Sequence, residues 1–94
     1  MDEETIRALF NDAMIWQAVL AGRFQLRLVR DRQAPPEAIS GQPQGTRSQQ
    51  LLIMDANRFV AKVHRYLRPD QPFLHDRPPD PKRVVIGAKM YALR

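Results

Sequence analysis

The first quarter of the chain carries apolar residues at helical spacing. They recur at intervals of three or four positions and are Ile6, Leu9, Phe10, Ala13, Met14 and Leu20. Trp16 and Val19 widen this stripe. Asp2 can cap the start of a helix, and Gly22 follows as a stop signal. The pattern predicts one amphipathic helix over residues 3–21.

Three later segments have the patterns of strands. Residues 24–30 alternate apolar and polar side chains, as in a strand with one buried face. Residues 49–54 end in a run that is apolar on both faces, which predicts a central strand. Asp55-Ala56-Asn57 is a tight turn, and the residues after it alternate again up to position 67. We therefore predict a β-hairpin over residues 49–67.

Proline and glycine divide the rest of the chain into two loops and a last hairpin. Residues 31–48 are rich in Pro and Gln, and residues 69–82 are rich in Pro, so neither is predicted to form a regular element. Two short apolar runs flank Gly87-Ala88, which favours a hairpin with a type II′ turn. The second run, residues 90–93, is then an edge strand. A homodimer formed by strand pairing at that edge is one arrangement that the sequence allows.

These elements fit together in one simple way. The 94 residues suffice for one domain. We predict an α+β fold in which one N-terminal amphipathic helix packs on an antiparallel sheet of about three to five strands. Residues 31–48 and 69–82 are the two loops of this single small basic domain.

Charge is unevenly distributed along the domain. The net charge is +5, yet the first twelve residues are acidic, with Arg7 as their only basic side chain. Most of the basic side chains are Arg, whose planar guanidinium suits phosphate and carboxylate groups. Such a balance attracts polyanions, and it also keeps a small protein soluble. The charge therefore favours nucleic acid or an acidic protein as the partner.

The strand predicted over residues 58–68 carries most of the candidate chemistry. Alternation places five polar side chains on its outer face, where positions two residues apart are separated by about 7 Å. These side chains are Arg58, Lys62, His64, Tyr66 and Arg68. Arg65 interrupts the apolar face. In open sheets that bind nucleic acid, cations contact phosphates and aromatic rings stack on bases. The six residues are our candidates for binding RNA or single-stranded DNA, although an ordinary solvated strand shows the same residue types.

Cleavage of RNA without a metal is one alternative. It needs a general base, a general acid and a cation for the developing phosphorane charge. His64 can serve as base or acid, with Tyr66 or His75 as its partner and Arg65 or Arg68 as the phosphate clamp. Small bacterial toxins that cleave RNA use basic sheets with similarly few groups, which is an analogy of layout alone. Because a lone His on a strand is more often a surface residue, the sequence favours binding over catalysis.

A protein–protein interaction is the second alternative. The chain would then belong to a small operon or mobile element, as a toxin, antitoxin or inhibitor with an acidic partner. Residues 31–48 would become ordered on contact. Trp16 lies beside the main helical stripe and is a candidate partner contact, because exposed Trp marks interfaces. A wide buried stripe is the competing interpretation.

Several classes of site are excluded by composition. The chain has no cysteine, which removes disulfides, Cys-based zinc sites and thiol nucleophiles. His64, Asp70, His75 and Asp76 match no metal-ligand spacing, and no glycine-rich loop suits a nucleotide. No apolar run approaches the length of a membrane span, and the N-terminus is acidic where a signal peptide is basic. We therefore predict a cytoplasmic protein with no cofactor, metal or membrane partner.

Overall fold

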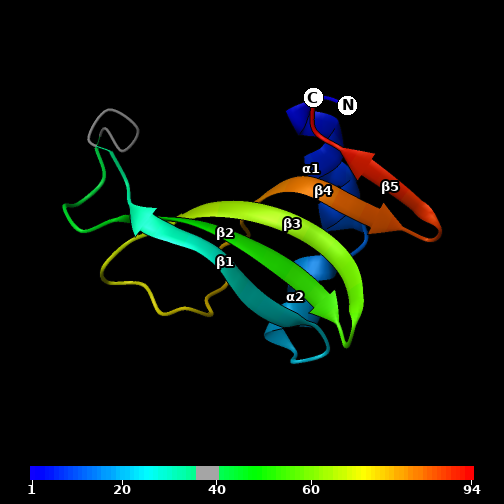
Figure 1. Cartoon of the computed structure of the whole chain (residues 1–94), viewed down its shortest axis with the longest axis horizontal. Coiled ribbons are helices and arrows are strands. Elements are labelled where there is room, and N and C mark those ends of the chain that lie inside the picture. The colour runs from blue at the N-terminus through cyan, green and yellow to red at the C-terminus, as the bar shows by residue number, and fades with distance from the viewer. Residues whose placement is uncertain (36–40) are drawn as a thin grey trace.

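The computed structural model describes residues 1–35 and 41–94, and both of its helices precede the strands (Figure 1). The elements in this part of the chain are α1 (Glu3–Asp12), α2 (Ile15–Leu20), β1 (Gln25–Gln33), β2 (Arg47–Asp55), β3 (Arg58–Leu67), β4 (Asp80–Ile86) and β5 (Lys89–Ala92). This is the predicted α+β fold. No helix among the described residues is long and apolar enough to span a membrane.

The sheet is an antiparallel meander. Its strands lie in the order β1-β2-β3-β4-β5, so each strand pairs with its neighbours in sequence and β1 and β5 form the two edges. The predicted hairpin over residues 49–67 is confirmed as β2 and β3. The last hairpin is confirmed as β4 and β5, where Ile86 pairs with Lys89 and Gly87 has a φ of 62°. A positive φ at this turn position is what a type II′ turn requires, and glycine adopts it without a steric penalty.

The two loops are shorter than the sequence predicted. β1 continues to Gln33 and β2 begins at Arg47, so strand pairing takes in both ends of the 31–48 segment. The backbone groups of these polar residues form hydrogen bonds between β1, an edge strand, and β2. Composition alone did not predict this pairing. Residues 36–40 of this segment lie outside the described residues. The second loop ends where β4 begins, at Asp80.

The prediction of one continuous helix over residues 3–21 is wrong. Met14 adopts a left-handed conformation with a φ of 55°, and this residue separates α1 from α2. In an unbroken helix Ile15 would lie about 180° around the axis from Ile6. The break turns both apolar groups toward the sheet. Met14 was expected on the buried stripe but is 56% exposed.

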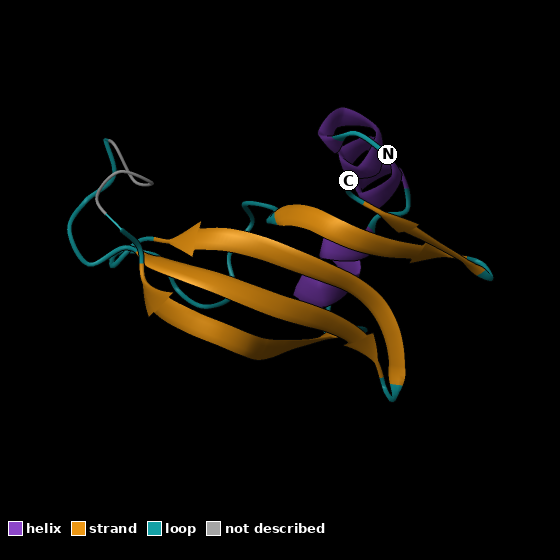
Figure 2. Ribbon diagram, turned by 45° about the horizontal axis from the view of Figure 1, so that its top comes forward, coloured by secondary structure: helices purple, strands orange, loops and turns teal. Residues whose placement is uncertain are grey.

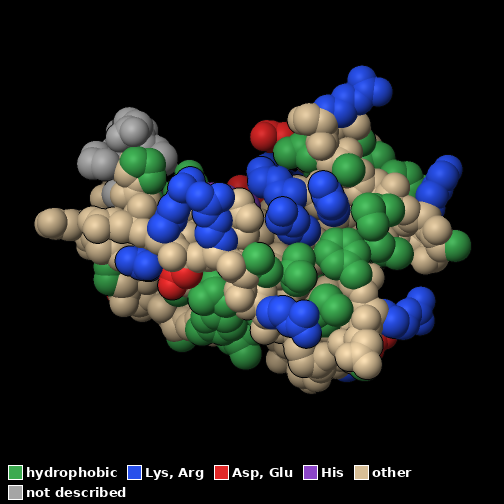
Figure 3. All heavy atoms as spheres, in the orientation of Figure 1, with side chains coloured by type: hydrophobic (Ala, Val, Ile, Leu, Met, Phe, Trp, Pro, Cys, Tyr) green, Lys and Arg blue, Asp and Glu red, His purple; other side chains and the backbone are tan. Residues whose placement is uncertain are grey.

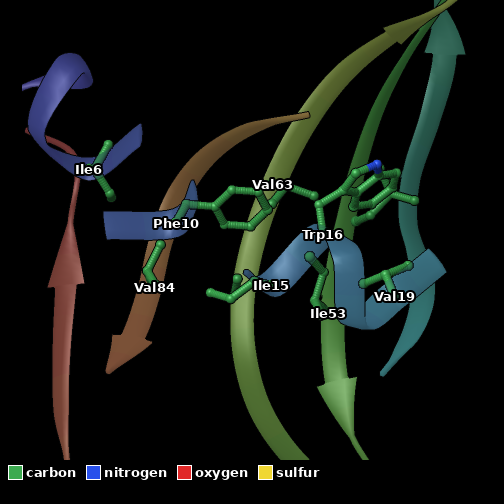
Figure 4. Packing of buried hydrophobic residues seen from close by; sticks show 10 residues of the cluster. Ile6, Phe10, Ile15, Trp16, Val19, Ile53, Val63 and Val84 are labelled. Carbon is green, nitrogen blue, oxygen red and sulfur yellow. The ribbon is translucent and has the colours of Figure 1, made fainter. Parts of the chain in front are cut away.

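The core lies between the two helices and one face of the sheet, as Figure 4 shows. Ile6 and Phe10 of α1 lie near Val84 of β4, while the side chains of α2 lie over the central strands. Trp16 is the largest fully buried side chain and lies near Val63 of β3. Figure 2 agrees with Figure 1 in placing both helices on the same side of the sheet. Within residues 1–35 and 41–94, the opposite face of the sheet is therefore left uncovered by helices.

Three bulges interrupt the regular alternation of the strands. The register shifts between Leu28 and Arg30, between Ile53 and Met54, and on β4 opposite Lys62 and Val63. A bulge adds one residue to one strand, so the residues beyond it change face relative to a simple count. The second bulge lies at Val60, which packs against the core.

Candidate functional site

The sheet face turned away from the helices carries three rows of side chains that cross the strands. Residues directly opposite one another on antiparallel strands share a face. The rows are Arg27, Leu52, Lys62 and Arg83; Arg30, Gln50, His64 and Asp80; and Arg32, Ser48 and Tyr66. Neighbours within a row are about 5 Å apart, and successive rows are about 7 Å apart. We call these rows, together with Lys82 at the β4 bulge, the basic face.

The six cations of the basic face have no carboxylate partner among the described residues. They are Arg27, Arg30, Arg32, Lys62, Lys82 and Arg83. Asp80 is the carboxylate of the rows, and its Oδ1 lies 3.4 Å from Nη2 of Arg7. Figure 3 looks onto this side of the molecule and shows far more Lys and Arg surface than Asp and Glu surface. The face therefore presents a positive potential to solvent.

Three cations of the basic face line one hollow where β3 meets β4. An open hollow of about 320 Å³ lies there, and its polar lining consists of Gln50, Lys62, His64, Lys82 and Arg83. Three of these side chains are cations that converge on one space. A hollow of this kind concentrates anions, because the low-dielectric walls of the protein focus the field of the cations.

His64 lies in the middle of the basic face and responds to its charge. Its Nε2 is 2.9 Å from Oγ of Ser48, and its ring meets the Tyr66 ring edge to face with centroids 4.8 Å apart. Burial lowers the pKa of His64, and Lys82 and Arg32 lower this pKa further, while Asp80 opposes them. The imidazole is therefore mainly neutral near pH 7. Tyr66, beside this neutral ring, is 39% exposed. Its phenol is therefore the aromatic group that the basic face presents to solvent.

Arg65 does not share the basic face with the other candidates. It lies on the helix-covered side of β3 and is only 6% exposed. Its Nε donates to Oε1 of Gln49 at 2.9 Å, and its Nη1 donates to the carbonyl oxygen of Phe73 at 2.7 Å. The guanidinium also lies over the Phe73 ring at 4.8 Å. Arg65 therefore fastens the loop after β3 to the sheet, and its predicted contact with a polyanion across the outer face is not supported.

The predicted row also loses members at its two ends. The bulge at Val60 pairs Arg58 with Asp55, which places Arg58 on the side of the helices, beside Ala13 and Ile15. The prediction that Arg58 lies on the outer face is therefore wrong. Arg68 follows the last residue of β3, and its Nε lies 3.5 Å from Oδ1 of Asp70. Lys62, His64 and Tyr66 remain on the face as predicted.

Trp16 is not available as a partner contact. The indole is 2% exposed, and its Nε1 donates to the carbonyl oxygen of His75 at 3.0 Å. The helix break at Met14 causes this burial, because it turns the exposed side of the predicted stripe toward the sheet. Trp16 and Arg65 instead hold two carbonyl groups of the same loop against the helix side of the sheet.

A second, smaller space brings together the residues considered for catalysis. A cleft of about 100 Å³ opens where β4 no longer pairs with β3. It lies between β3 and the segment before β4, and its titratable lining consists of His64, Arg65, Tyr66, His75, Arg77 and Asp80. Burial lowers the pKa of His75, with Arg65 adding to the effect. We call this space the β3–β4 cleft.

Most cations of the basic face were not predicted from the sequence. Arg27, Arg30 and Arg32 come from β1, and Lys82 and Arg83 come from β4. Alternation over residues 24–30 does identify Arg27 as an outward-facing side chain. Alternation does not identify Arg30 and Arg32, because the bulge after Leu28 reverses which positions of β1 face outward beyond that point. Strand order then brings these residues to within reach of Lys62.

No metal site is formed by the described residues, among which no three His, Asp or Glu side chains lie close enough together to hold an ion. Comparisons of the chain with protein-family models, with curated proteins and with solved structures find no match. The basic face and the β3–β4 cleft are therefore the two candidate functional sites.

Proposed function

We propose that this chain is a module that binds single-stranded nucleic acid, RNA or DNA, through the basic face. One observation carries the proposal: six cations without carboxylate partners among the described residues share one uncovered sheet face with an exposed tyrosine. Cations that track a phosphate backbone and an aromatic ring that stacks on a base are the shared parts of sheet surfaces that bind single strands.

The shape of the face favours a single strand over a duplex. Proteins that read duplex DNA commonly insert a helix or a two-stranded ribbon into the major groove. Here both helices of the described chain lie behind the sheet (Figures 1 and 2), so neither is presented on the basic face. A flexible single strand can follow the three rows and place its bases on the sheet. Its phosphates then meet cations contributed by β1 on one side and by β4 on the other.

The centre of the face offers contacts for bases as well as for phosphates. Tyr66 supplies a ring for stacking, which contributes about 1–3 kcal/mol per base in proteins of this type. Leu52 lies between Arg27 and Lys62 in the first row and provides partly exposed apolar surface. Gln50 adds an amide that can donate and accept hydrogen bonds. These contacts are sparse, so we expect weak sequence preference.

Binding is tested by fluorescence anisotropy with labelled 12-nucleotide RNA and DNA strands across a salt series. We expect saturable binding at low salt that weakens steeply as salt rises. Tyr66→Phe should retain the affinity within about twofold and Tyr66→Ala should weaken it about tenfold, because stacking needs the ring and not the hydroxyl. Absence of binding to both strands at low salt would contradict the proposal.

One observation favours a second candidate function, the cleavage of RNA. The β3–β4 cleft brings His64, Tyr66 and His75 to one space together with the Arg65 guanidinium. In such a reaction a base takes the proton of a 2′-hydroxyl and the 2′-oxygen attacks phosphorus. The bond from phosphorus to the 5′-oxygen then breaks as an acid protonates that oxygen, leaving a 2′,3′-cyclic phosphate.

Cleavage is tested with a labelled RNA strand and the DNA strand of the same sequence as its control. If His64 is the acid or base, His64→Ala abolishes the cyclic phosphate product while RNA binding stays within about threefold, since a neutral His64 adds no charge to the face. The DNA must remain intact, because it lacks the attacking hydroxyl. An unchanged rate in His64→Ala would remove this residue from the mechanism.

A further inference from the structure

The β3–β4 cleft has a property that nucleic-acid binding by the basic face does not use. It lies at the part of β3 that extends beyond its last pair with β4, His64 with Asp80. Its walls come from β3, from Gln42, and from the segment that holds His75 and Arg77. The cleft shares His64, Tyr66 and Asp80 with the basic face, but its other walls lie outside that face, at one edge of the sheet.

The Arg65 guanidinium has one nitrogen with nothing to bind. Nε and Nη1 are occupied by Gln49 and by the carbonyl oxygen of Phe73. Nη2 is buried and has no hydrogen-bond partner among the described residues. Arg65 is more than nine-tenths buried and also lines the cleft. A buried guanidinium N–H without an acceptor is unusual, because a desolvated charged donor is destabilising when unpaired.

His75 presents a second buried donor beside the first. Its Nδ1 accepts a hydrogen bond from the backbone N–H of Arg77 at 3.2 Å. Burial and the nearby Arg65 favour the neutral ring by lowering the pKa of His75. In a neutral imidazole whose Nδ1 accepts, the proton lies on Nε2. This Nε2 is also buried without a hydrogen-bond partner among the described residues, so the cleft is lined by two side chains with unmatched N–H donors.

We propose that the β3–β4 cleft is a binding site for a single phosphate group. Phosphate oxygens accept several hydrogen bonds at once and suit the planar donors of Arg. Arg77 is an exposed cation among the lining residues, and Tyr66 also lines the cleft. The volume of about 100 Å³ admits one tetrahedral oxyanion.

The cleft also contains one feature that opposes an anion. Asp80 lines it, and Asp76 lies close enough to His75 to raise the pKa of that imidazole. The Asp80 carboxylate is offset by Arg7, whose Nη2 lies 3.4 Å from Oδ1. Two guanidinium groups, Arg65 and Arg77, then oppose the remaining negative charge. We therefore expect phosphate to bind weakly and saturably, with its strongest contacts to Arg65 and His75.

Inorganic phosphate is the first probe, and NMR of the full chain is the measurement. Titration should shift the side-chain N–H signals of Arg65 and the ring signals of His75 together, along one saturable curve. His75→Phe and Arg77→Ala should each weaken phosphate binding about fivefold to tenfold or more, because each removes a donor or a charge. Arg83→Ala is the matched control: it removes one exposed guanidinium from the basic face and should leave phosphate binding unchanged.

A second arm distinguishes free phosphate from the end of a nucleic acid. A strand with a 5′-phosphate is compared with the same strand carrying a 5′-hydroxyl. If the site takes a strand end, the 5′-phosphate tightens binding to the wild-type chain, and this gain disappears in Arg77→Ala. If inorganic phosphate binds and the 5′-phosphate brings no gain, the ligand is free phosphate. Either result supports a phosphate site.

Two results would overturn this inference. One is the absence of a saturable shift at Arg65 and His75, which would mean that phosphate does not reach the two buried donors. The other is an equal loss of phosphate binding in Arg83→Ala and in Arg77→Ala, which would mean that phosphate only follows the net charge. The inference does not rest on nucleic-acid binding by the basic face, because inorganic phosphate alone tests it. The single Trp16 reports by its fluorescence whether His75→Phe is folded.

Discussion

Replacing Arg30 and Arg58 separately gives the sharpest test of the basic face. Both side chains are exposed, and neither has an ion pair within the described part of the chain, so each Ala variant should fold like the wild type. Each substitution removes one positive charge. Arg30 lies on the basic face in line with His64, whereas the bulge at Val60 places Arg58 on the other side of the sheet. Comparison of the two variants therefore separates the effect of position on the sheet from the effect of net charge.

The expected effect follows from the number of cations on the face. Each phosphate that is neutralised on a single strand contributes about −0.7 to the slope of log K against log salt. Six engaged cations give a slope of about −4, which is a loss of about 300-fold in affinity between 50 and 200 mM salt. Arg30→Ala should make the slope shallower by about 0.7, and Arg58→Ala should leave it unchanged.

The assay is fluorescence anisotropy of a labelled strand at five or more salt concentrations for the three proteins. A slope shallower than about −2 for the wild type would mean that fewer than about three phosphates are contacted. That result would refute the basic face as the binding surface. Equal flattening by Arg58→Ala and Arg30→Ala would refute the register argument, since it would show that binding follows charge and ignores position.

Two further predictions concern the fold. Met14→Gly should raise the free energy of unfolding by up to about 1 kcal/mol in urea, because glycine adopts the left-handed conformation without the penalty of a side chain. If residues 3–21 formed one continuous helix, the same substitution would instead lower the free energy of unfolding by about 1 kcal/mol. Stability should also fall as pH drops below the ordinary histidine pKa of 6.5, because the lowered pKa of His64 and His75 makes the unfolded chain bind protons first. Thermal melts between pH 7.5 and 5.5 should show a smaller loss of stability for His64→Gln than for the wild type. An equal loss in the two proteins would contradict this cause.

The strands could be predicted because their pattern is local. In the 58–67 segment the inward positions 61 and 63 are apolar, and the structure buries both side chains completely. The hairpin of β2 and β3 follows from two such segments around a short turn. The break in the helix had no such local signal, because neither Gly nor Pro occurs between residues 3 and 21. It arises because two apolar groups on opposite sides of one helix must both reach the same sheet.

The candidate site could be predicted only in part. Lys62, His64 and Tyr66 were identified from alternation, since no bulge of β3 lies between them. Arg58 was misplaced because one extra residue at Val60 reverses the faces, and a bulge has no reliable sequence signal. Arg65 was recognised as an interruption of the apolar face, but its partners lie on another strand and in a loop. Those contacts depend on distances between atoms in the folded structure, which cannot be read from the spacing of residues along the chain.

The order of residues by itself determined the class of fold, the central hairpin and the excess of arginine, because each depends on neighbours in the chain. Only the tertiary structure decided which cations share a surface and which donors are buried without an acceptor. Strand order brings β1 and β4 to either side of the central hairpin, and burial removes the water that would otherwise bind Arg65 and His75. Both effects arise from packing between distant segments, so they exist only once the chain has folded.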